Sequence, residues 1–69
     1  MNRLVEYHLE RLKNKSAEVR LKSIAELRLL ADPAALEALE QVYKSDPEPD
    51  VRKAAQEAGY DIFMKNRLG

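Results

Sequence analysis

The 69-residue sequence contains no cysteine and no tryptophan, only two glycines and a single histidine. Without cysteine the chain has no disulfides, no thiolate chemistry and no cysteine-ligated metal site. Its longest stretch without a charged residue, residues 33–36, covers four positions, so no segment is apolar enough to cross a bilayer. Twelve basic and twelve acidic side chains cancel, so no net field draws the chain to nucleic acid or to a membrane surface.

The first residues reach an arginine and a glutamate before any apolar run, unlike a secretory signal peptide, and we therefore expect a cytoplasmic protein. β-branched residues are few, whereas alanine, leucine, glutamate, lysine and arginine dominate. With 35% charged and 45% hydrophobic residues, the composition is typical of a folded helical domain. These features predict one small all-α domain over residues 1–69.

Apolar periodicity and capping signals predict four helices. Ser16 and Asp32 are suitable N-caps, because their side-chain oxygens can accept backbone N–H groups of a following helix. Pro33 suits a first helical position. Pro47 and Pro49 interrupt the chain before the last helix, since the residue before a proline leaves the helical region. The predicted helices span about residues 2–13, 17–31, 33–44 and 49–66.

An internal repeat relates the two halves of the chain. The segment Glu18–Arg20 recurs as Asp50–Arg52, each time after a polar spacer and at the start of a helix. The step from position 18 to position 50 is here called the repeat offset. Upstream, Leu9 matches Leu39 by a slightly shorter step, and the difference falls in the proline-containing loop. The chain therefore contains two copies of one helix pair.

The ordered series of motif residues is more specific than any one of them. These residues are Glu18-Val19-Arg20, Ser23-Ile24, Leu27, Leu30, Asp32-Pro33, Ala35-Leu36, Leu39, Asp50-Val51-Arg52 and Ala54-Ala55. Over about residues 16–59 the series resembles the HEAT-like repeats found in phycobilisome-lyase-related proteins. The resemblance implies a short α-solenoid of four antiparallel helices, about two repeats long. It also implies a structural role for the arginine after each valine, with Asp32 the expected acidic partner of Arg20.

The last predicted helix does not resemble a polar cap at the end of a repeat array. Gly59 and Tyr60 stand where the earlier repeat has a leucine and an arginine. With the apolar face turned inward, Tyr60 and Met64 are expected on the far side of this helix and Phe63 on its flank. Aromatic residues and methionine are enriched at binding surfaces. These three residues are candidate partner-binding residues, unless they pack on the third helix or over the end of the bundle.

A second apolar stripe lies on the predicted second helix. Leu21, Ala25 and Leu29 follow one another at every fourth position, whereas the positions one repeat offset later are polar. We favour burial of this stripe against the first and fourth helices. If that interpretation fails, the stripe is an interface.

Charge is distributed unevenly between the two halves. Residues 1–30 hold seven basic and four acidic side chains, net +3, and residues 31–69 hold five and eight, net −3. A head-to-tail contact between copies would be electrostatically favourable. Such contacts form filaments when they do not close, so a closed homo-oligomer or a different protein partner is the safer expectation.

No catalytic or metal-binding constellation is present in the sequence. His8 has no neighbouring set of ligands and is interpreted as structural. Asp46, Glu48, Asp50 and Glu57 match four positions of a calcium loop, but a valine occupies the position that requires glycine. No serine lies on a glycine-flanked elbow, and no glycine-rich phosphate loop is present. The sequence predicts a protein that is not an enzyme and that has no cofactor.

The most basic stretch, residues 11–28, includes Arg20, Lys22 and Arg28, which are candidates to supply charge at an interface. Glutamates interleave with them and no aromatic residue lies among them, which argues against nucleic-acid binding. The expected function is a small non-catalytic HEAT-like scaffold that binds a protein partner or a copy of itself. The alternative is an accessory factor in the attachment or handling of a bilin chromophore.

Overall fold

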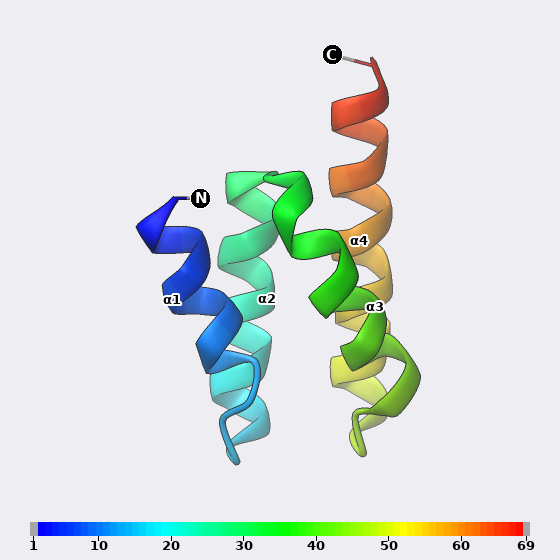
Figure 1. The fold of residues 1–69 in the computed structure, drawn as a ribbon. Helices are drawn as coiled ribbons and strands as arrows, with labels where there is room; N and C mark the ends of the chain where they lie inside the picture. Colours follow the sequence, from blue (N-terminus) through cyan, green and yellow to red (C-terminus); the bar gives the residue numbers. More distant parts are fainter. Residues whose placement is uncertain (1, 69) are drawn as a thin grey trace.

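Four helices in two layers make up the structure, a computed structural model that describes residues 2–68 (Figure 1). Helix α1 spans Arg3–Arg11, α2 Ala17–Leu30, α3 Leu36–Ser45 and α4 Pro49–Leu68, and a short 3-10 helix, η1, spans Pro33–Ala35. Helices α1 and α3 form one layer and α2 and α4 the other, and successive helices run antiparallel. Helix α1 packs on α2, α3 packs on α4, and α2 lies beside α4. The predicted all-α short solenoid is confirmed.

The helix bounds differ from the predicted ones at several ends. Helix α1 ends at Arg11, slightly earlier than predicted, and α4 continues to Leu68, slightly further than predicted. The segment predicted as one helix from residue 33 begins instead with η1, in which the Ala35 N–H donates to the Asp32 carbonyl. The α-helical part therefore starts at Leu36.

Side-chain caps hold the starts of these elements. The Ser16 hydroxyl accepts the Val19 N–H at 3.3 Å, and the Asp32 carboxylate accepts the Ala34 N–H at 2.9 Å, so both predicted caps are confirmed. The residue after the end of α2, Ala31, has φ 53°, in the left-handed region that non-glycine residues seldom adopt. The carbonyl of Ala31 accepts a hydrogen bond from the Asn66 side chain at 2.9 Å, which ties the end of α2 to α4.

The core lies between the two layers and draws on all four helices. Its buried apolar residues are Val5, Leu12, Ile24, Leu27, Ala35, Leu39, Val51, Ala55, Ala58 and Ile62. Ala55 and Ala58 are buried on α4, the helix that contacts both α2 and α3. Within residues 2–68 no helix combines the length and the apolar character that a membrane crossing requires. The same residues contain no cluster of three or more potential metal ligands.

Candidate protein-interaction surfaces

Arg20 forms a buried ion pair that joins the two helix pairs. Its Nε and Nη2 donate to the two carboxylate oxygens of Asp46 at 2.7 and 3.0 Å, and both side chains are more than nine-tenths buried. Its Nη1 also donates to the carbonyls of Asn14 and Lys15. This two-point geometry is the strongest form of an arginine–carboxylate contact. Arg20 is thus a structural residue of the interior, and its assignment as a surface charge for a partner is wrong.

The expectation that Asp32 is the acidic partner of Arg20 is also wrong, for a geometric reason. Arg20 lies in the first turn of α2, and Asp32 follows the end of that helix. The intervening helix separates them by about 18 Å. Asp46 lies in the α3–α4 loop, which an antiparallel arrangement brings to the same end of the molecule as the start of α2 (Figure 1).

The environment of Asp46 favours its charged form. Burial by itself raises the pKa of Asp46, but the hydrogen bonds from Arg20 and from the Glu48 N–H, together with the charges of Arg20 and Arg52, outweigh it. The pKa of this carboxyl therefore lies below its ordinary value of 3.8. An anionic carboxylate is held against Arg20 at neutral pH.

The stripe of Leu21, Ala25 and Leu29 is not buried as a unit. Leu21 is half-buried, Ala25 is exposed, and Leu29 is 76% exposed. The favoured interpretation, burial of the whole stripe, is therefore wrong for its last two residues. The stripe instead forms one wall of a groove between α2 and α4, here called the outer groove. Its lining residues are Leu21, Ile24, Ala25, Arg28, Leu29, Ala54, Glu57 and Lys65.

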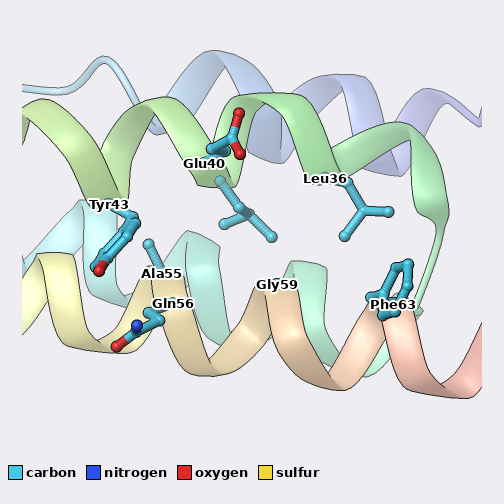
Figure 2. Close-up of a pocket in the computed structure, with 8 residues that line it drawn as sticks. Leu36, Glu40, Tyr43, Ala55, Gln56, Gly59 and Phe63 are labelled. Carbon is cyan, nitrogen blue, oxygen red and sulfur yellow. The ribbon is translucent and has the colours of Figure 1, made fainter.

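A second groove, here called the end groove, runs between α3 and α4 on the side that faces away from the first helix pair (Figure 2). Leu36 from α3 and Phe63 from α4 point toward each other at one end, and Tyr43 closes the other end over α4. Between them lies Gly59, where a Cβ atom would meet nothing within 4 Å. The missing side chain leaves the floor of the groove open.

The three residues expected on the outside of α4 divide between two surfaces. Phe63 is 49% exposed and lines the end groove, so it only partly packs on the third helix. Tyr60 is 65% exposed and lies in a shallow hollow with Arg28 and Asp61. Met64 is half-buried. The structure therefore places both aromatic side chains on the surface, but not in one patch.

The two grooves are small and open to solvent. Their volumes are about 290 Å³ for the end groove and about 370 Å³ for the outer groove, and both are open to solvent. Sites for small molecules and cofactors usually fall between about 300 and 1,000 Å³ and enclose most of the ligand. The two volumes lie at the lower end of that range and neither groove encloses its contents, so they suit a few side chains of another helix better than an enclosed small molecule.

The other two candidate interface charges, Lys22 and Arg28, each face an acid on the surface. Lys22 lies 3.5 Å from Glu18 within α2, and Arg28 lies 2.6 Å from Asp61 across the α2–α4 contact. The Arg28–Asp61 pair is partly exposed and marks the rim of the interface between the two helix pairs. Lys22 and Arg28 thus lie on the surface as expected, each beside a carboxylate.

Helix α1 carries a cluster that the sequence analysis missed. Arg11 stacks its guanidinium 5.3 Å from the centre of the Tyr7 ring and donates Nε to the buried Ser23 hydroxyl at 3.2 Å. Tyr7 and Leu4 are about half exposed beside it. His8 is buried, and its Nδ1 has no hydrogen-bond partner. The i, i+4 spacing of Tyr7 and Arg11 was the available signal.

A two-layer stack of antiparallel helix pairs that repeats along one direction defines an α-solenoid. The family profile described as HEAT repeats matches residues 2–58. The chain belongs to the HEAT repeat family. The match does not distinguish the phycobilisome-lyase-type branch within it. Searches of the curated proteins and of the solved structures gave no match.

Proposed function

We propose that this protein is a small scaffold that docks another protein through the open grooves of its helix stack. HEAT repeats generally act as protein-interaction scaffolds. The observation that carries the proposal is the exposure of large apolar side chains beside grooves, led by Leu29 at 76% and Tyr60 at 65%. Such side chains at a groove are what a partner helix buries as anchors.

The charges around the grooves fit a polar rim. Glu57 and Lys65 flank the outer groove, and Glu40 flanks the end groove. An apolar centre with charged groups at the edge is the usual anatomy of a protein interface. The chromophore-handling alternative stays a prediction, which an absorbance titration with a bilin tests directly.

Site-specific photo-crosslinking in the protein's own host cells tests the docking proposal. The photoreactive residue p-benzoylphenylalanine is placed at Tyr60 or Phe63, with a matched control at Glu10, whose side chain is 78% exposed on α1. The expected result is a defined protein adduct at the two aromatic positions and none at Glu10. The absence of any adduct, or the same adducts from Glu10, would contradict the proposal.

A further inference from the structure

We infer that the partner of the end groove is a second copy of this chain, added head to tail so that the two-layer stack continues. The inference deepens the proposed function, on which it rests, by naming the partner. It starts from the finding that the two helix pairs are repeats in their contacts as well as in their sequence.

Two loop networks show which positions are equivalent. Asn14 Oδ1 accepts the Ser16 N–H at 2.9 Å, and Asp46 Oδ1 accepts the Glu48 N–H at 3.0 Å. In the same two loops, the Nη1 of Arg20 donates to the Asn14 carbonyl at 2.8 Å and that of Arg52 to the Asp46 carbonyl at 2.7 Å. Each residue of the second loop network lies one repeat offset after the residue that makes the same hydrogen bond in the first. Each contact between the two helix pairs of one chain therefore predicts a contact between copies. The residue of the first pair is replaced by the residue one repeat offset later, and the residue of the second pair by the residue one repeat offset earlier in the next copy.

The first translated contact concerns the rim of the interface. Inside the chain Arg28 meets Asp61 at 2.6 Å. One repeat offset after Arg28 stands Tyr60, and one repeat offset before Asp61 stands Leu29. In a continued stack Tyr60 of one copy thus faces Leu29 of the next. These two are the most exposed large apolar side chains of the described residues, so the contact would bury the apolar surface that is most exposed to solvent.

The second translated contact concerns the buried ion pair. Arg20 of the first pair binds Asp46 of the second, and the same shift places Arg52 against Asn14 of the next copy. Asn14 offers an amide oxygen without a charge, so this bond is weaker than the internal one. A weaker bond at this point favours reversible association over a permanent assembly.

The end groove has room for the incoming helix pair. Gly59 is the counterpart of Leu27, whose side chain is fully buried inside the chain. The open floor at Gly59, between Leu36 and Phe63, leaves space for apolar side chains of the next copy (Figure 2). Stacking also brings the half with net +3 against the half with net −3 of its neighbour.

Two charged variants test the register of this contact. Tyr60→Arg places a cation against Leu29 of the next copy, and Leu29→Asp places an anion against Tyr60. Each variant alone is expected to weaken self-association by about tenfold or more, measured by sedimentation velocity over a concentration series. Both positions are exposed, so thermal melts by circular dichroism serve as the control that each variant folds.

Mixing the two variants gives the decisive measurement. In an equimolar mixture the introduced arginine meets the introduced aspartate, which recreates the Arg28–Asp61 pair between copies, while the opposite contact keeps the original Tyr60 and Leu29. The mixture is therefore expected to associate in alternation where neither variant does alone, and to dissociate as salt is raised. A mixture that stays monomeric overturns the inference.

Two results with the unsubstituted chain would also overturn the inference. A monomer at millimolar concentration, or a dimer that does not grow further, overturns the head-to-tail contact. Neither result bears on the proposed function with a different partner, which the photo-crosslinking experiment tests separately.

A variant at Asn14 tests the second translated contact. Asn14→Asp gives Arg52 of the neighbouring copy a carboxylate and is expected to strengthen association by about tenfold, whereas the matched control Asn14→Ala is not.

Discussion

Arg20 in the first turn of α2 and Arg52 in the first turn of α4 occupy equivalent repeat positions, but their surroundings differ. Arg20 binds both oxygens of Asp46 and two backbone carbonyls in the interior, whereas Arg52 is half-buried and donates to one carbonyl. The difference arises because the second helix pair supplies the Asp46 carboxylate to Arg20. In a repeat array a residue's energetic role thus depends on its neighbour as much as on its own repeat.

The largest expected effect comes from removing the buried arginine. Arg20→Met leaves the Asp46 carboxylate without its counter-ion and is expected to lower the free energy of unfolding by about 3–5 kcal/mol, measured by urea denaturation. The matched change Arg52→Met should lower it by about 1 kcal/mol, because one hydrogen bond is lost.

A chain of this length has a total stability of only about 3–10 kcal/mol, so Arg20→Met can fail to fold. Arg20→Lys keeps the charge and supplies a milder second variant, which is expected to fall between the two. Equal losses for the two methionine variants would contradict the distinction drawn between Arg20 and Arg52.

The second comparison concerns Leu27 and Gly59. Leu27→Ala opens a cavity in the core and is expected to lower the free energy of unfolding by about 2–5 kcal/mol. Gly59→Ala should raise it by about 1 kcal/mol, because alanine favours a helix and the added methyl group has open space. Thermal and urea unfolding of both variants measure the two signs, and a destabilised Gly59→Ala would mean that the groove floor is occupied.

The dependence of stability on pH below about 5 tests the role of Asp46. Its pKa is lower in the folded chain than the ordinary 3.8, so its contribution is fully present above that value and is lost as pH falls through the lower folded pKa. Urea midpoints measured from about pH 5 to about pH 2 should therefore fall. In Asp46→Asn the fall should be smaller, and an unchanged slope would contradict the assignment.

The smallest expected effect concerns the rim pair. Arg28 and Asp61 are partly exposed, so a double-mutant cycle with alanine is expected to give a coupling free energy of about 0.2–1 kcal/mol. Raising the salt concentration should reduce it further. A coupling as large as that between Arg20 and Asp46 would show that the two pairs are packed more tightly at the rim than their exposure indicates.

Local signals in the sequence predicted the helices and their caps well. Ser16 and Asp32 are read from their position before apolar runs, since a cap depends on a few neighbouring residues. The 3-10 start at Pro33–Ala35 was missed, because proline at a first position is compatible with either kind of helix. The end of the long α4 was placed too early, since helix ends fray and carry weak signals.

The contacts between helix pairs were harder to predict. The pairing of Arg20 with Asp46 depends on which loops meet at one end of the stack, and nothing near either residue shows this. Likewise, the exposure of Leu29 depends on the absence of a neighbour over that corner of α2. For Leu29 the internal repeat becomes informative only beside the structure, because its counterpart Asp61 contacts Arg28 within the chain.

The bonds from Asn66 have a consequence for the ends of two helices together. Its side-chain amide reaches both Ile62 in its own helix and Ala31 at the end of α2. Opening of the final turns of α4 must therefore release the left-handed corner that leads into η1. Amide protons near both segments should exchange with solvent in one concerted event, and losing a single amide group by Asn66→Ala should speed that exchange in two places far apart along the chain.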